Sequence, residues 1–62
     1  METYWISTYA FTIGVDVDNG IIKTIPPILR VFRGQQFITL QNWLNQKFRN
    51  QVEIIKVEDE KQ

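Results

Sequence analysis

The sequence predicts a small α+β fold, in which one amphipathic helix packs on a mostly antiparallel β-sheet. Three observations lead to this fold class. Residues 3–13 are rich in β-branched and aromatic side chains, Asn19-Gly20 stands between two alternating segments, and residues 40–49 carry apolar side chains at helical spacing. The predicted order is strand, strand, turn, helix, strand, within a single domain over residues 1–62.

The first predicted strand covers residues 3–13, TYWISTYAFTI, and is apolar on both of its faces. Trp5 and Tyr9 lie on one face, whereas Tyr4 and Ile6 lie on the other. A strand of this kind is usually covered on both sides. Since one helix covers only one face, we expect a second copy of the chain on the other face, with a half-exposed face as the alternative.

The next segment, VDVDNGIIKTI, predicts a β-hairpin that turns at Asn19-Gly20, because a type I′ turn needs positive φ at both central residues. This register places Asp16 opposite Lys23, which adds an ion pair across the ladder. Gly14, just before the segment, predicts a bulge or bend. The letters DVDNG also occur in calcium loops, but no Glu follows at the required distance, so the hairpin is the preferred interpretation.

Residues 26–34, PPILRVFRG, precede the helix and lack two backbone donors, because both Pro26 and Pro27 are present. Pro27 fits the first position of a helical turn, and Gly34 fits a left-handed stop. We therefore favour a turn or short helix for this segment. A short extended edge remains the alternative.

The predicted helix spans residues 40–49, with Thr39 as its N-cap and Asn50 as a left-handed exit. Lys47 and Arg49 are placed at the negative end of the helix dipole, where cations are favoured. The apolar stripe of the helix is formed by Leu40, Trp43, Leu44 and Phe48.

A last strand follows in QVEIIKVE, with alternating and consecutive apolar residues over 52–57. The residues after it, 58–62, are mainly charged and are expected to fray. The last predicted strand is thus followed by a frayed acidic tail.

The chain has 62 residues and neither cysteine nor histidine. A chain this short buries only about 60% of its unfolded surface, and it usually needs a disulfide, a metal or another subunit for stability. Disulfides and a structural zinc site are excluded by composition. We therefore expect a homo-oligomer, a dimer or larger, without cofactor or metal. The N-terminus lacks a signal-peptide pattern and no apolar run is long enough to span a bilayer, so the cytosol is the expected location.

The formal net charge is zero, yet the charges are segregated along the chain. Three acids give residues 1–20 a charge of −3, and five cations without any acid give residues 21–50 a charge of +5. Residues 51–62 carry −2. Either this is an ordinary mixed surface, or the middle of the chain meets an anion.

The residue types argue against an enzyme. Without His and Cys, the usual nucleophile–base pairs are absent, and no phosphate-binding glycine pattern is present. A binding role remains. Side chains that suit an anionic ring-bearing ligand are guanidinium groups for phosphates, aromatic rings for stacking and polar groups for hydroxyls or base edges. The candidate ligand-binding residues are Arg30, Arg33, Trp5, Tyr9, Phe32, Gln35 and Asp16.

Three functions are compatible with these residues. The first is capture of a small nucleotide-like anion, and the second is inhibition of a protein partner through an exposed aromatic face. Nucleic-acid binding is the weakest, because a pI near 6 leaves little surface to follow a phosphate backbone. No membrane association is expected.

The sequence also resembles small proteins of phages and prophages. The resemblance is carried by residues 4–22, by Pro26-Pro27-Ile28 with Arg30 and Gly34, and by the Leu40, Trp43, Leu44 stripe. Phage proteins of this size include sponges that sequester nucleotide-derived immune signals, such as the histidine–ADP-ribose made by TIR-domain defence enzymes. The resemblance implies an anti-defence role in the host cytosol, with no catalytic residue.

Overall fold

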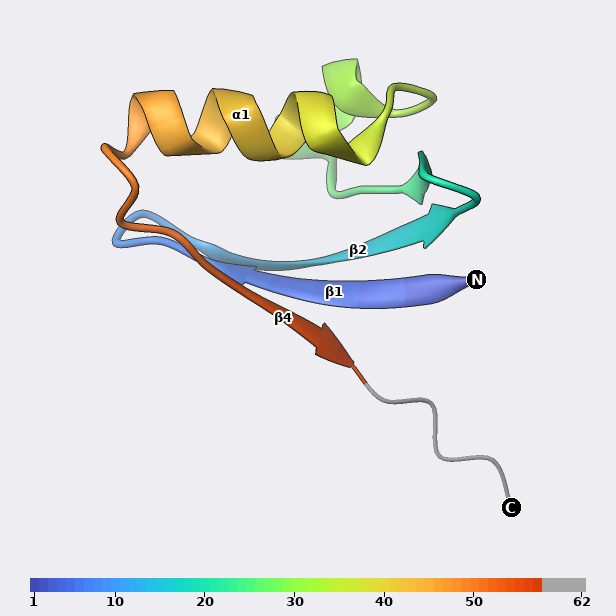
Figure 1. The fold of residues 1–62 in the computed structure, drawn as a ribbon, viewed down its shortest axis with the longest axis horizontal. Helices are drawn as coiled ribbons and strands as arrows, with labels where there is room; N and C mark the ends of the chain where they lie inside the picture. The colour runs from blue at the N-terminus through green and yellow to red at the C-terminus, as the bar shows by residue number, and fades with distance from the viewer. Residues whose placement is uncertain (58–62) are drawn as a thin grey trace.

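A computed structural model describes residues 1–57 of the chain. It contains one four-stranded antiparallel sheet of strand order β3-β2-β1-β4, with α1 on one face (Figure 1). The predicted α+β class with a mostly antiparallel sheet is therefore confirmed. The elements are β1 (Glu2–Ser7), β2 (Thr12–Asp18), β3 (Ile21–Thr24), a 3₁₀ helix η1 (Pro27–Phe32), α1 (Phe37–Lys47) and β4 (Glu53–Val57). The predicted frayed tail, 58–62, lies outside the described residues.

The predicted single strand over residues 3–13 is wrong, because the chain turns within it. The N–H of Thr8 donates to the carbonyl of Phe11 at 2.8 Å. The Thr8 hydroxyl accepts from the N–H groups of Ala10 and Phe11 at 3.0 and 3.1 Å. A threonine side chain that bonds two following amides closes a tight turn. Two antiparallel strands result, and they pair from Glu2↔Val17 to Ser7↔Thr12.

The second hairpin turns where the sequence predicts it. Asn19 and Gly20 have φ of 57° and 81°, as a type I′ turn requires, and Asp18 pairs with Ile21. The expected pair of Asp16 with Lys23 is wrong, because a register shift places Asp16 opposite Thr24. The Asp16 carboxylate instead accepts a 2.7 Å hydrogen bond from the Thr3 hydroxyl on β1.

Gly14 has a different role from the predicted bulge. It pairs in register with Trp5 on the neighbouring strand. A Cβ at Gly14 would lie 3.5 Å from the indole ring of Trp5, so the ring lies across the glycine. The irregularity lies further along, in the pairing of β2 with β3, where the register shifts between Asp16 and Val17.

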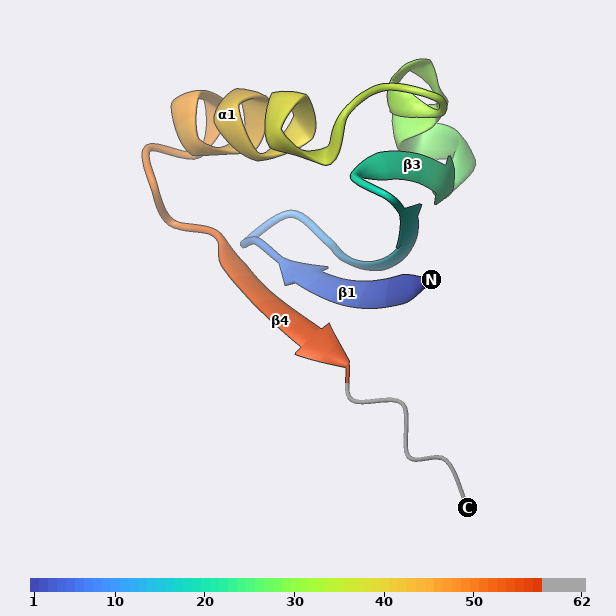
Figure 2. The same cartoon turned by 45° about the vertical axis from the view of Figure 1, so that its right-hand side comes forward.

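Residues 27–32 form a short helix, as predicted in preference to an extended edge. Leu29, its buried residue, has non-helical φ and ψ, so η1 consists of two turns with a kink between them. Gly34 follows with φ of 85°, as the predicted left-handed stop. The chain then runs beside β3, where the N–H of Gly34 donates to the carbonyl of Ile22 and the N–H of Ile22 donates to that of Gln35, both at 2.9 Å (Figure 2).

Helix α1 begins at Phe37, three residues before the predicted start, and ends at Lys47. Thr39 is not the N-cap. Gln36 precedes the helix in an extended conformation and makes no side-chain cap bond. The N–H of Phe37 instead donates to the carbonyl of Gly20 at 2.8 Å. The hairpin backbone thus satisfies a donor that a side chain would otherwise cap.

The core lies between α1 and the covered face of the sheet. The fully buried side chains there are those of Ile6, Val15, Leu40 and Leu44, and Ile22 is 1% exposed. The predicted helix stripe is confirmed except at Trp43, which is only half-buried and packs on Phe32 with 5.2 Å between ring centroids. The buried apolar residues are Ile6, Ile13, Val15, Val17, Ile22, Ile25, Leu29, Phe37, Leu40, Leu44 and Phe48.

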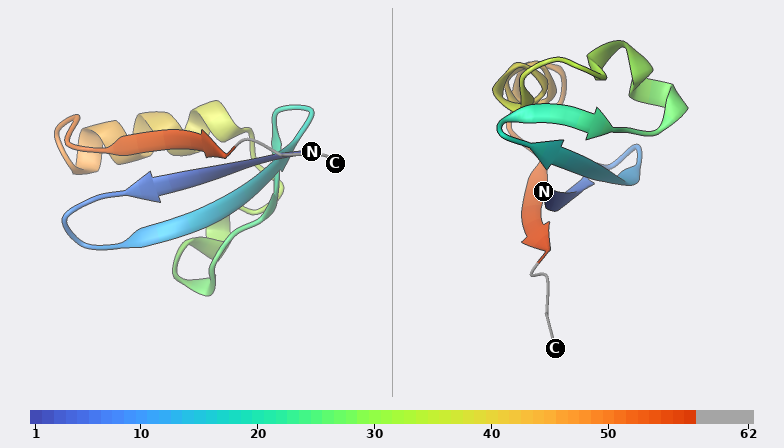
Figure 3. Two further views of the ribbon diagram at one scale, coloured as in Figure 1. Left: turned by 90° about the horizontal axis from the view of Figure 1, so that it is seen from below. Right: turned by 90° about the vertical axis from the view of Figure 1, so that its right-hand side faces the viewer.

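The other face of the sheet has no helix on it among residues 1–57 (Figure 3). We call it the open face. It carries a row of three neighbouring residues, in which Trp5 of β1 lies between Gly14 of β2 and Ile55 of β4. Trp5 and Ile55 are 48% and 50% exposed. The alternative of a half-exposed face therefore describes the isolated chain.

Candidate functional site

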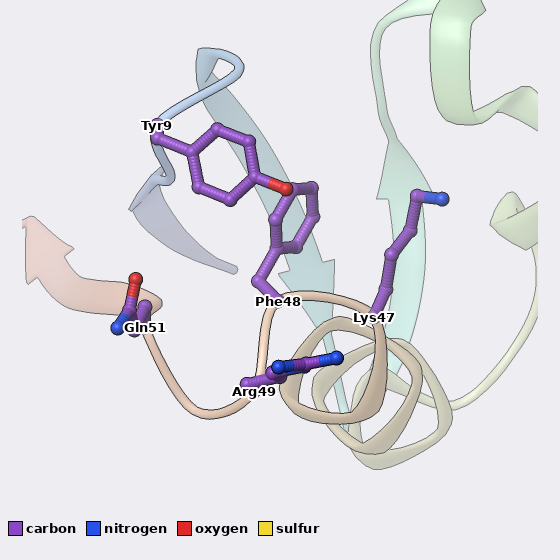
Figure 4. A pocket seen from close by; sticks show the side chains of 5 residues that line it. All are labelled: Tyr9, Lys47, Phe48, Arg49 and Gln51. Carbon is purple, nitrogen blue, oxygen red and sulfur yellow. The ribbon is translucent and has the colours of Figure 1, made fainter.

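The main candidate site is a hollow of about 420 Å³ at the C-terminal end of α1 (Figure 4). We call it the basic-aromatic hollow. It combines two rings, two cations and one amide that come from the β1–β2 turn, the end of α1 and the segment before β4. Its lining residues are Tyr9, Lys47, Phe48, Arg49 and Gln51.

Tyr9 forms the aromatic wall of this hollow. It stands at the tip of the β1–β2 turn, which the bonds of Thr8 hold closed, and it is 82% exposed. Its ring meets the buried ring of Phe48 edge-on, with centroids 5.1 Å apart and planes at 81°. Phe11 packs on Phe48 in the same manner, at 5.7 Å. Edge-to-face contacts of this kind orient a ring, so one face of Tyr9 is available to a second ring.

The cations come from the chain reversal that ends α1. The N–H of Phe48 donates to the carbonyl of Leu44 at 2.9 Å, and the N–H of Asn50 donates to that of Asn45 at 2.8 Å. Arg49 and Asn50 have φ of 55° and 64°. Asn50 is thus in the left-handed region as predicted. A second left-handed residue that is neither Gly nor Asn is uncommon, and such positions concentrate at functional sites.

The charge of the hollow is positive. Lys47 and Arg49 carry two full charges, whereas the helix end contributes about −0.5. Within residues 1–57, the one ion pair joins Lys56 and Glu2 at 3.4 Å, so neither cation of the hollow pairs with a carboxylate there. The Lys47 ammonium lies 5.7 Å from the centroid of the Trp43 ring, which places it between this hollow and a shallower one formed with Gln46.

The seven residues predicted for the site do not lie together. Trp5 and Asp16 are on the open face, and Tyr9 is in the basic-aromatic hollow. Arg30 and Arg33 are exposed on and just after η1, where the N–H of Arg33 donates to the carbonyl of Arg30 at 3.0 Å. Neither arginine lines the basic-aromatic hollow or its shallow neighbour.

Phe32 and Gln35 belong to the same region as the two arginines. Phe32 is half-buried against Trp43, so its ring supports the helix. Gln35 holds β3 through its backbone carbonyl, while its side chain is exposed. The sequence thus identified one residue of the hollow, Tyr9, and placed Lys47 and Arg49 only at a helix end.

A separate polar cluster ties the start of β1 to β4. The Tyr4 hydroxyl donates to the Glu2 carboxylate at 2.8 Å, and Lys56 lies on the same carboxylate. The hydrogen bond from Tyr4, together with Lys56, lowers the pKa of Glu2 from its ordinary value of 4.5. The same hydrogen bond to Glu2 raises the pKa of Tyr4 above 10.0. The Tyr4 ring also stacks on Phe37 at 4.5 Å, so this cluster holds strand and helix together.

Among residues 1–57, no group of three or more acidic side chains is placed to hold a metal ion, and no helix is long and apolar enough to cross a membrane. No family model, curated protein or solved structure matches the chain.

Proposed function

We propose that this chain is a non-catalytic binding protein that captures a small anionic, ring-bearing ligand of nucleotide type in the basic-aromatic hollow. The observation that carries the proposal is a hollow of about 420 Å³ whose lining includes an exposed tyrosine ring and two cationic side chains. Small-molecule sites are typically about 300–1,000 Å³, so the space suits one nucleotide.

Each part of such a ligand has a counterpart. A base stacks on the free face of Tyr9, and stacking on an aromatic side chain contributes about 1–3 kcal/mol per base. The phosphates lie against Lys47 and Arg49, whose charged hydrogen bonds contribute about 1.5–3 kcal/mol each. The Gln51 amide offers a donor and an acceptor to a sugar hydroxyl or a base edge.

A binding role rather than a reaction is supported by what lines the hollow. The chain has no His or Cys, and among residues 1–57 no carboxylate lines the hollow to serve as a base. Sequestration of an ADP-ribose-type immune signal is the use that the likeness to phage proteins implies. We propose that the protein acts in this way in the host cytosol, as an anti-defence sponge.

Calorimetric titration with four probes tests this proposal. ADP-ribose and ADP carry both ring and phosphates, adenosine lacks the charge, and pyrophosphate lacks the ring. We expect the first two to bind at least about tenfold more tightly than either of the others, because each missing part removes about 1.4 kcal/mol or more. Equal binding of pyrophosphate and ADP would contradict a role for Tyr9.

Matched variants assign the site. Lys47→Gln and Arg49→Ala each remove one cation from the hollow, whereas Arg30→Ala and Arg33→Ala remove exposed cations elsewhere. We expect the first pair to weaken ADP binding about tenfold each and the second pair to leave it within about twofold. If Arg30→Ala and Arg33→Ala weaken ADP binding and the other two variants do not, the ligand binds near η1 and the hollow is not the site.

A further inference from the structure

The two edge strands of the sheet, β3 and β4, differ in whether their outer hydrogen-bonding groups are paired. The outer edge of β3 is covered by the chain itself, through the hydrogen bonds of Ile22 with Gly34 and Gln35 and through the bond from Phe37 to Gly20. At the other edge, β4 pairs with β1 and with no other strand of residues 1–57. Exposed edge strands are templates for pairing with another chain.

The free edge adjoins apolar surface on the open face. Trp5 pairs directly with Ile55 of β4, and about half of each side chain is exposed. Val57 lies on the same face, two residues along. This apolar row runs up to the β4 edge of the sheet, and about half of the Trp5 and Ile55 side chains stays in contact with solvent.

Charge decides how a second copy can be accommodated. The open face carries three carboxylates, those of Asp16, Asp18 and Glu53, against a single cation, Lys23 at the far end of the sheet on β3. Two open faces stacked on each other would bring these carboxylates together in a poorly hydrated interface, which is unfavourable. A copy that lies beside the sheet leaves all three carboxylates in water.

We propose that a second copy adds to β4 as an antiparallel strand, with the two-fold axis passing at Ile55, so that two four-stranded sheets become one of eight strands. In this register Ile55 faces the partner's Ile55, and Glu53 faces the partner's Val57. The open face then carries a continuous apolar row in the order Trp5, Ile55, the partner's Ile55 and the partner's Trp5.

The neighbouring registers are less favourable. An axis at Lys56 sets two lysines opposite each other, and an axis at Glu53 sets two glutamates opposite each other. An axis at Ile54 places Glu53 against the partner's Ile55 and interrupts the apolar row with a carboxylate. Of these four registers, the one centred on Ile55 both avoids opposed like charges and keeps the row intact. This inference is independent of the proposed ligand.

The test uses the exposed position at the axis. Sedimentation velocity of the full chain is expected to give the mass of two chains, falling to one on dilution. Ile55→Lys and Ile55→Glu each place like charges at the axis, and we expect each to be monomeric. Val31→Lys, on the exposed side of η1, carries the same kind of change away from β4 and is expected to stay dimeric.

Mixing identifies the register. When isotope-labelled Ile55→Lys is mixed with Ile55→Glu, we expect native mass spectrometry to find the mixed dimer, since the introduced ammonium and carboxylate groups would be directly opposed at the axis. Absence of the mixed dimer, or a dimeric Ile55→Lys variant, would overturn the proposal. A wild-type chain that sediments as a monomer would also overturn the proposal. The same holds if that monomer binds a different protein through its open face.

A measurement on the wild type covers the case in which the variants do not fold. Hydrogen exchange of the β4 amides is expected to slow as protein concentration rises, and by a larger factor than exchange of the β2 amides. Exchange in β4 that does not depend on concentration would refute the edge pairing.

Discussion

Replacing Arg49 by glycine separates the strain in the hollow from its binding capacity. Arg49 has φ of 55°, a conformation that disfavours an L-residue by about 1–2 kcal/mol and that glycine adopts freely. Glycine loses about 0.5–1 kcal/mol more backbone entropy on folding, so the net change is a stabilisation of about 0.5–1 kcal/mol. For a domain of this size, that raises the melting temperature by about 2–8 °C.

The same substitution removes one of the two cations of the hollow. We expect ADP affinity to fall about tenfold, because one charged hydrogen bond to phosphate is lost. The assays are thermal unfolding followed by circular dichroism and calorimetric titration with ADP, on the same preparation. Greater stability with weaker binding is the expected combination.

Two companion variants separate the causes. Arg49→Ala keeps the strain and loses the charge, so binding falls while stability changes by less than about 0.5 kcal/mol. Asn50→Gly relieves the neighbouring left-handed residue and keeps the charge, so binding is unchanged and the stabilisation is small, because Asn tolerates this region. If Arg49→Gly destabilises the fold or leaves ADP affinity intact, the reasoning about this position fails.

Three further predictions concern the core, the turn and pH. Leu44→Ala removes a fully buried side chain and lowers the free energy of unfolding by about 2–5 kcal/mol, close to the whole stability expected for this chain; urea unfolding measures it. Thr8→Val removes the acceptor of two amides, lowers stability by about 1 kcal/mol and weakens ADP binding, and unchanged binding would mean that the turn does not position Tyr9. Because folding lowers the pKa of Glu2, its carboxylate stabilises the fold above pH about 4.5, and this contribution is lost as the pH falls through the pKa of the folded state. In the Tyr4→Phe variant, NMR titration should show the pKa of Glu2 moving up towards 4.5. An unchanged pKa would rule out the hydrogen bond from Tyr4.

Local chemistry explains which parts of the fold the sequence predicted. The hairpin at Asn19-Gly20 depends on two residues that accept positive φ, and the helix depends on apolar spacing alone. The turn at Thr8 does not show in the sequence because residues 8–11 include none of the usual turn residues; the Thr8 hydroxyl and one backbone hydrogen bond close it. The start of α1 was missed because the hairpin backbone at Gly20 satisfies its donor.

The hollow depends on contacts that no local pattern contains. Tyr9 and Phe48 are far apart in the sequence and meet only when the first hairpin folds against the end of α1. The available signal was that Lys47 and Arg49 flank Phe48 and precede Asn50, a residue typical of left-handed helix exits. That signal places two cations next to the Phe48 ring, but it does not show that the Tyr9 ring packs against Phe48.

Mapping of NMR chemical shifts on titration with ADP-ribose tests the central claim most directly. We expect the amide signals that move to be those of Tyr9, Lys47, Arg49 and Gln51, with the indole signal of Trp43 moving less. Shifts confined to Arg30, Arg33 and Gln35, or no shifts at saturating ligand, would contradict a binding site at the end of α1.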